Sequence, residues 1–68
     1  MADRLSNRLL ELRGERGLTQ AALAEQVEVS RKTINTVENG IFVPSTLLAL
    51  KIARALEVRV EEIFSLEA

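Results

Sequence analysis

Apolar residues recur at intervals of three and four along nearly the whole chain, a spacing that places them along one side of a helix. Gly17, Gly40 and Pro44 interrupt this pattern and divide it into short segments. No apolar run approaches the ~18 residues that a membrane-spanning helix requires. A chain of 68 residues is long enough for one small core and too short for two. We therefore expect a single all-α domain over residues 1–68, without strands and without a membrane contact.

The spacing predicts a compact bundle of five short helices, at about residues 3–16, 19–27, 30–38, 44–56 and from residue 60 onward. Thr19 and Ser30 are residue types that favour N-cap positions, so the second and third helices have well-marked starts. Arg59 is a poor capping residue, and we expect the fifth helix to fray there. Leu5, Leu9 and Leu12 recur at i, i+4 and i+7 and mark the apolar stripe of the first helix. The expected core consists of Leu9, Leu12, Leu23, Ala24, Val27, Val29, Ile34, Val37, Leu48, Ala49, Ile52, Ala53, Leu56, Ile63 and Phe64.

Several kinds of chemistry are excluded because the residues they require are missing. The chain has no cysteine and no histidine, which removes disulfides, thiolate or imidazole metal sites, and Cys/His or Ser/His catalysis. Its two aromatic residues, Phe42 and Phe64, are too few to stack the bases of a single strand. Glu61 and Glu62 could suggest a pair of catalytic carboxylates, but adjacent residues point apart on a helix and therefore cannot act on one substrate atom together. We expect no enzyme, no metal and no cofactor.

The charge of the chain is nearly balanced, with 9 basic and 10 acidic residues and a net charge of −1. This balance argues only weakly against binding nucleic acid, because binding depends on basic groups that face phosphate. Residues 1–34 hold six basic and five acidic groups, whereas residues 35–68 hold three and five. No signal-peptide apolar segment opens the chain, and the lack of cysteine fits a reducing compartment. We expect a cytoplasmic protein.

The second and third helices are joined by a turn of about three residues, which predicts a tightly packed pair. Ala24 is the small residue that such close packing requires. If Ile34 and Val37 face the core, the opposite side of the third helix is polar and faces outward. A helix that presents basic and amide side chains in this way suits the major groove of double-stranded DNA. The outward residues are Arg31, Lys32, Asn35 and Thr36.

On these residues the sequence resembles the Cro and phage-repressor type of helix-turn-helix transcription regulators, also called the xenobiotic-response-element family. The resemblance spans nearly the whole chain. It is carried by Arg8 to Gln20, Ala22-Leu23-Ala24 to Ser30, Thr33-Ile34, Glu38-Asn39-Gly40, Pro44-Ser45 and Ala49 to Leu56. It implies a lambda-repressor-like fold with its motif at about residues 19–38. The implied function is sequence-specific binding of double-stranded DNA by a transcription regulator, which we expect to be a repressor; activation is the open alternative.

The resemblance also implies roles for individual residues. The residues expected to contact base edges are Arg31, Lys32, Thr36 and Asn35. Those expected to contact the DNA backbone are Gln20, Ser30, Thr33, Asn39 and Arg13. By the same resemblance, Arg13 pairs with Glu38 and ties the first helix to the third.

Two features depart from the family pattern. Glu28, in the turn of the motif, and Glu57, before the fifth helix, stand where the family usually has glycine. Each either adopts a left-handed backbone at a cost of roughly 1 kcal/mol, or its helix ends differently. After Gly40, where the family often has a basic residue, the chain has three apolar residues at 41–43. We expect one phosphate contact to be missing there.

A homodimer is expected on DNA, because one reading helix covers about half of a near-palindromic site. Leu47 and Leu50 lie off the core stripe of the fourth helix and leave apolar surface for a partner. Phe42 either joins that surface or folds inward. The family resemblance implies partner contacts in the loop before the fourth helix and at the start of the fifth helix. The residues assigned to the interface are Phe42, Val43, Leu47, Val58, Arg59 and Val60.

Two other functions are compatible with the same residues. One is an antitoxin-type module that binds DNA and also neutralises a protein partner. The other is the N-terminal DNA-reading module of a larger regulator that acts through a protein partner.

Overall fold

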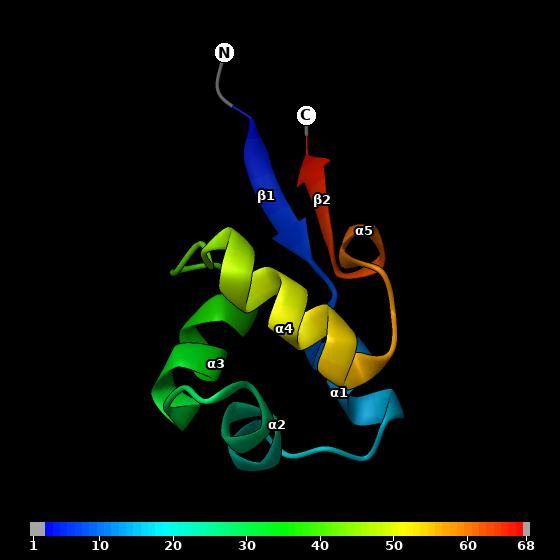
Figure 1. Cartoon of the computed structure of the whole chain (residues 1–68). Coiled ribbons are helices and arrows are strands. Elements are labelled where there is room, and N and C mark those ends of the chain that lie inside the picture. Colours follow the sequence, from blue (N-terminus) through cyan, green and yellow to red (C-terminus); the bar gives the residue numbers. More distant parts are fainter. Residues whose placement is uncertain (1–2, 68) are drawn as a thin grey trace.

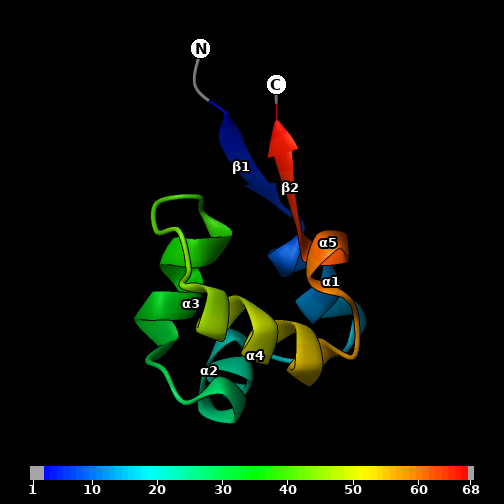
Figure 2. The same ribbon diagram turned by 45° about the horizontal axis from the view of Figure 1, so that its top comes forward.

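The computed structural model of the protein describes residues 3–67 and contains both helices and strands (Figure 1). In chain order the elements are β1 (Arg4–Asn7), α1 (Leu9–Glu15), α2 (Gln20–Val27), α3 (Arg31–Glu38), α4 (Thr46–Leu56), α5 (Val60–Ile63) and β2 (Phe64–Glu67). The two strands lie side by side and project beyond the helices, at the opposite end of the molecule from α2 (Figures 1 and 2). No helix within residues 3–67 has the length and apolar character needed to cross a membrane.

The expectation of an all-α fold is wrong at both ends of the chain. The segment expected to open the first helix instead forms β1, which pairs antiparallel with β2 from Arg4 opposite Glu67 to Asn7 opposite Phe64. The side-chain oxygen Oδ1 of Asn7 accepts the backbone N–H of Leu9 at 3.0 Å, at the point where α1 begins. The periodicity could not reveal the strand, because its pairing partner lies at the other end of the sequence.

One hydrophobic core joins all five helices and the first residue of β2. It consists of Leu9, Leu12, Leu23, Ala24, Val27, Ile34, Val37, Leu48, Ile52, Ala53, Leu56, Ile63 and Phe64. The core predicted from the sequence is therefore confirmed, except that Val29 and Ala49 are only partly buried at its edge. Leu5, expected on the same helical stripe as Leu9 and Leu12, lies in β1 instead and is 39% exposed. This packing holds α3 with one face against the core and the other toward solvent.

The predicted N-caps are present. The side-chain oxygen of Thr19 accepts the N–H of Ala22 at 3.0 Å, and that of Ser30 accepts the N–H of Thr33 at 3.2 Å. At the start of α5, Arg59 makes no side-chain cap, as expected. The carboxylate of Glu62 reaches back instead and accepts the N–H of Arg59 at 2.8 Å. This bond satisfies a backbone donor at the start of α5 from three residues further along the chain, which the residue type at the cap position alone does not reveal.

The two glutamates that replace family glycines both adopt the left-handed backbone. Glu28 ends α2 with φ 63°, and Glu57 ends α4 with φ 59°. In each case the N–H of the following valine bonds to a carbonyl five residues earlier, at 3.0 Å. The turn between α2 and α3 and the turn between α4 and α5 therefore share one geometry.

Candidate nucleic-acid interface

Helices α2 and α3 form a closely packed pair joined by the turn at residues 28–30. Leu23, Ala24 and Val27 of α2 are buried, as are Ile34 and Val37 of α3. Ala24 has no side chain beyond its Cβ, so it permits the close approach that the sequence predicted. The pair fixes the direction of α3 relative to the rest of the molecule.

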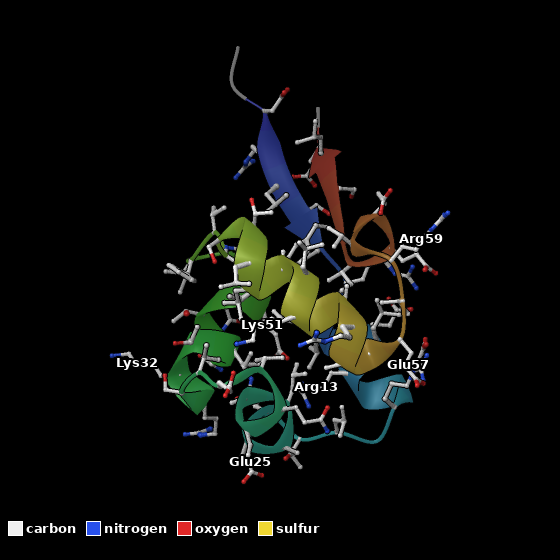
Figure 3. All side chains as sticks on the ribbon, in the orientation of Figure 1. Arg13, Glu25, Lys32, Lys51, Glu57 and Arg59 are labelled. Carbon is white, nitrogen blue, oxygen red and sulfur yellow. The ribbon has the colours of Figure 1, made fainter. Side chains whose placement is uncertain are left out.

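The outward side of α3 carries the residues expected to read base edges. Arg31, Lys32 and Asn35 are exposed, and Lys32 points away from the body of the molecule (Figure 3). Thr36 is only partly exposed, and its hydroxyl donates to the backbone carbonyl of Thr33 at 2.9 Å. The structure thus brings three of the four side chains to the surface. The hydroxyl of the fourth residue, Thr36, bonds back to its own helix.

The two cations of α3 differ from most of the others in having no carboxylate partner. Four basic residues elsewhere form salt bridges, but neither Arg31 nor Lys32 forms one with any residue in the described range 3–67. Their positive charges are therefore not neutralised locally and can face an anion. Arg4, Arg54 and Arg59 also form no salt bridge within residues 3–67, but α3 is the helix that carries two such cations side by side. Because the positions of the basic groups matter more than their sum, this adjacent pair offsets the unfavourable net charge.

The smaller polar residues at the ends of α3 bond to one another. The hydroxyls of Ser30 and Thr33 lie 3.0 Å apart, and Asn39 Nδ2 donates to Asn35 Oδ1 at 3.2 Å. Ser30, Asn35 and Asn39 are exposed, and Thr33 is partly buried. These contacts hold the side chains along the solvent side of the helix and leave further donors and acceptors on both amides.

A cluster around Glu38 ties the motif to α1. Arg13 Nε lies 2.6 Å from Glu38 Oε2, and Arg13 Nη2 lies 3.3 Å from Oε1, so the pairing that the family resemblance implied is confirmed. Only 13% of the Arg13 side chain and 4% of the Glu38 side chain are exposed. Arg13 Nη1 also donates to the carbonyl of Leu18 at 2.8 Å.

Gln20 completes this cluster, and no pattern in the sequence indicated that it would. Its amide Nε2 donates to Glu38 Oε1 at 2.8 Å. One carboxylate at the end of α3 therefore accepts from α1 and from the first residue of α2. Gln20 and Glu38 are 18 positions apart in the sequence, so only the three-dimensional arrangement of the helices brings them together. Gln20 retains a second amide N–H, which is free to face a phosphate.

The residues expected at a dimer interface fall into two groups. Phe42, Val43 and Leu47 are exposed, and Phe42 is 47% exposed, so it does not close the core. Val58 and Val60 are partly buried against the core, while Arg59 is exposed. Apolar surface is thus concentrated in the loop before α4 and on the first turns of α4.

No group of three or more Asp or Glu side chains within residues 3–67 is arranged to hold a metal ion. The hydrogen bond from Arg8 lowers the pKa of Glu11, and the hydrogen bond from Lys51 lowers that of Glu28.

A protein-family model described as helix-turn-helix matches residues 9–63, from the start of α1 to the end of α5. The chain belongs to this family, which is of the Cro and phage-repressor type. This helix-turn-helix protein is 44% identical over 63 residues to YgzD of Bacillus subtilis (strain 168), named an HTH-type transcriptional regulator, and the match covers 93% of this chain and 96% of YgzD. It is 52% identical over 58 residues to an HTH-type transcriptional regulator of Methanothermobacter thermautotrophicus, with 84% of each chain covered.

Among solved structures, the helix-turn-helix protein is similar to the restriction-modification controller protein C.AhdI from Aeromonas hydrophila. The TM-score is 0.77 with 38% sequence identity, and the match covers 81% of this chain and 83% of C.AhdI. The family, its named relatives and this fold together make the chain a DNA-binding regulator of transcription.

Proposed function

We propose that the protein is a sequence-specific repressor that inserts α3 into the major groove of double-stranded DNA. The observation that carries the proposal is the pair Arg31 and Lys32, which are exposed in the first turn of α3 and free of salt bridges within residues 3–67. Arginine pairs with the N7 and O6 atoms of guanine, and asparagine at position 35 can pair with adenine. Such a protein works where the chromosome is, and we place it in the cytoplasm.

The remaining polar residues are assigned by their positions around α3. Asn35 and Thr36 lie one turn further along the helix and take secondary base contacts. Ser30 and Thr33 at its start, and Asn39 at its end, bind the DNA backbone. Gln20 contributes its second amide N–H to a phosphate.

Arg13 has most of its donors already in use, because three of its N–H groups bond to Glu38 and Leu18. We assign it a backbone contact through its two remaining N–H groups. Its ion pair with Glu38 orients the guanidinium for that contact.

We further propose that two copies bind a near-palindromic operator. One α3 helix covers about a half-site, and a two-fold dimer places its reading helices ~34 Å apart, one turn of DNA. The exposed apolar residues Phe42, Val43 and Leu47 support this proposal, because a monomer gains nothing from leaving them in water.

Selection of bound sequences from a random pool of duplex DNA tests the function directly. We expect enrichment of a site with two inverted half-sites about ten base pairs apart. Recovery of unrelated sequences, with equal affinity for all of them, would contradict sequence-specific recognition. Enrichment of one asymmetric half-site would support α3 as the reader and contradict the dimer.

A further inference from the structure

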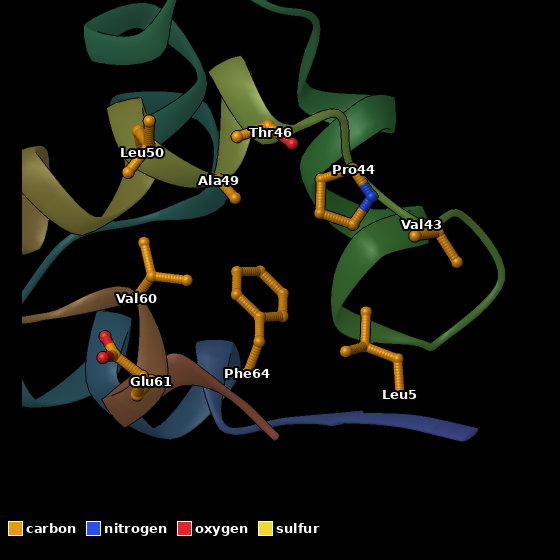
Figure 4. A pocket seen from close by; sticks show the side chains of 9 residues that line it. All are labelled: Leu5, Val43, Pro44, Thr46, Ala49, Leu50, Val60, Glu61 and Phe64. Atoms are coloured by element: carbon orange, nitrogen blue, oxygen red, sulfur yellow. The ribbon is translucent and has the colours of Figure 1, made fainter. Parts of the chain in front are cut away.

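An apolar groove lies between the sheet, the loop before α4 and α5. Its volume is about 410 Å³, and its lining includes Leu5, Val43, Leu50, Val60 and Phe64 (Figure 4). Leu5, Val43 and Leu50 are exposed to 39%, 67% and 55%. Leu50 and Leu47, both exposed on α4, also border a second hollow whose other lining residues are Glu28, Lys51 and Arg54.

The sheet beside this groove is small for an independent structure. Each strand has four residues, and the two strands come from opposite ends of the chain without a connecting turn. An isolated pair of strands is marginally stable in water. Both strands also extend beyond the helices, and neither view shows another segment of residues 3–67 alongside the outer edge of the first half of β1 (Figures 1 and 2).

The phase of the hydrogen bonds shows which backbone groups of β1 face outward. The N–H of Arg8 donates to the carbonyl of Ile63 at 2.8 Å, and these two residues are opposite one another in the register of the sheet. Because bonded pairs alternate along an antiparallel ladder, Arg4 and Ser6 direct their N–H and C=O groups toward β2. Leu5 therefore directs its N–H and C=O away from β2, toward the open edge.

The outer edge of β2 is less accessible to a new strand. By the same alternation Phe64 and Leu66 point their N–H groups outward, and the N–H of Phe64 donates to the carbonyl of Val60 in α5. Leu66 keeps outward backbone groups on β2, but it is Leu5 on β1 that also lines the apolar groove.

We propose that a second copy of this chain pairs along the outer edge of β1, so that two sheets join into one four-stranded antiparallel sheet. The pairing is centred on Leu5, whose N–H and C=O bond reciprocally to Leu5 of the partner subunit. The proposal rests on the homodimer proposed above and specifies how its two copies meet.

The sequence of β1 is self-complementary in this register. A two-fold axis at Leu5 sets Arg4 opposite the partner's Ser6 and Asp3 opposite the partner's Asn7, so no like charges face each other. The axis also keeps Leu5 on the same face as the partner's Leu5, which extends the apolar face made by Phe64 and Leu66. A second copy therefore fits the edge in hydrogen bonds, charge and apolar pattern together.

Joining the copies at β1 also positions the reading helices. The side chain of Asn7 at the end of β1 donates from Nδ2 to the carbonyl of Val37 in the last turn of α3, at 3.0 Å. In each copy, the strand that would form the junction is thus linked to α3 by this one hydrogen bond. A sheet shared across the two-fold axis fixes the two reading helices relative to each other.

Cysteine cross-linking tests the register, because the chain contains no cysteine of its own. In the proposed pair the two Cα atoms at position 5 lie about 5.5 Å apart, within the range that a disulfide bridges. We expect L5C to form a covalent dimer on mild oxidation. Matched variants are L66C on β2 and L10C on α1, a leucine that is 61% exposed, and both are expected to remain largely uncrosslinked.

A backbone change provides a second test that leaves the side chains intact. Chemical synthesis of the 68-residue chain with an N-methyl group on Leu5 removes the outward N–H without touching a bond to β2. We expect the dimer dissociation constant, measured by sedimentation, to rise about tenfold or more with unchanged helical circular dichroism.

The possible outcomes distinguish the β1 pairing from the proposed function. A dimer that cross-links through L66C, or that tolerates N-methyl-Leu5, contradicts the β1 pairing and leaves the homodimer standing. If the chain stays monomeric by itself and instead binds an added apolar peptide or another protein at this edge, the β1 pairing is contradicted as well. A chain that stays monomeric with and without its selected duplex overturns both the pairing and the homodimer, whereas its DNA affinity still reports on α3.

Discussion

Glu28 combines a strained backbone with a favourable side-chain contact. Its left-handed conformation, φ 63°, brings Cβ close to the backbone, which glycine would avoid. Its carboxylate Oε1 also lies 2.9 Å from Lys51 Nζ in an exposed ion pair that contributes little to stability. We predict that Glu28→Gly raises the free energy of unfolding by on the order of 1 kcal/mol through relief of the backbone strain. Thermal or urea unfolding measures the change.

The stability of the same variant at acid pH separates the effect of backbone strain from that of the ion pair with Lys51. Lys51 lowers the pKa of Glu28, so the ion pair stabilises the folded state above the usual glutamate pKa and is lost as pH falls through the lower folded value. The advantage of Glu28→Gly is therefore expected to grow toward acid pH. Glu57→Gly is the matched control, since Glu57 has the same backbone conformation and pairs with Arg16. Destabilisation by both variants at neutral pH would show that backbone strain is not the dominant effect.

Arg31 is the residue on which base discrimination depends most in our proposal. We predict that Arg31→Ala weakens binding to the selected site by ~1 to 3 kcal/mol and flattens the preference at one or two base pairs. Competition binding with single-base variants of the site measures both effects. Arg54→Ala is the control, because it removes an equal charge from exposed α4 surface. An equal loss on every sequence would reassign Arg31 to the phosphate backbone.

Asn39 is expected to behave differently, since it lies where the chain leaves α3. We predict that Asn39→Ala weakens binding to the specific site and to random duplex by similar factors. The side chain is neutral, so the slope of affinity against salt concentration should stay the same. Titration of both duplexes at several salt concentrations distinguishes this result from a loss confined to the specific site, which would indicate a base contact.

At the scale of elements, the Glu38 cluster holds three helices in one arrangement. Its carboxylate is almost fully buried and accepts bonds from Arg13 and Gln20. Removing one partner of a buried pair leaves the other charge uncompensated. We predict that Glu38→Ala lowers the free energy of unfolding by about 3–5 kcal/mol. Chemical denaturation measures this loss.

A double substitution shows whether the cluster acts through stability or through orientation. Replacing a buried pair by apolar residues of similar size is often neutral for stability. Arg13→Met combined with Glu38→Leu should therefore recover most of the lost stability, whereas DNA affinity is expected to stay below that of the unmodified chain. The double variant lacks both the pair that presents α3 and the backbone contact assigned to Arg13. Full recovery of affinity would mean that neither contributes to binding.

The helices of the motif could be predicted from the sequence because their determinants are local. Thr19 and Ser30 cap helices within three residues of themselves, and the apolar spacing that buries Ile34 lies within one helix. The strand pairing of residues 4–7 and the bond between Gln20 and Glu38 join distant parts of the chain, and no local pattern specifies them. The left-handed turn at Glu28 was one of two alternatives, since only the packed helices on both sides decide it.

At the scale of the whole molecule, the described chain measures 36 × 21 × 19 Å, and its α3 surface and its exposed apolar surface are separate features. A single α3 reads few base pairs, so affinity and specificity require a second copy. We predict that light scattering detects a dimer on the selected duplex, and that Val43→Asp, which places a charge in the apolar surface, weakens it. Leu10→Asp, which places the same charge on α1, should leave the dimer intact because Leu10 lies outside that surface. Binding of one protein per asymmetric half-site, with Val43→Asp indistinguishable from the unmodified chain, would exclude the dimer. In that case a single α3, with the backbone contacts around it, would have to account for all of the measured affinity, and the salt slope would then correspond to the cations of one copy alone.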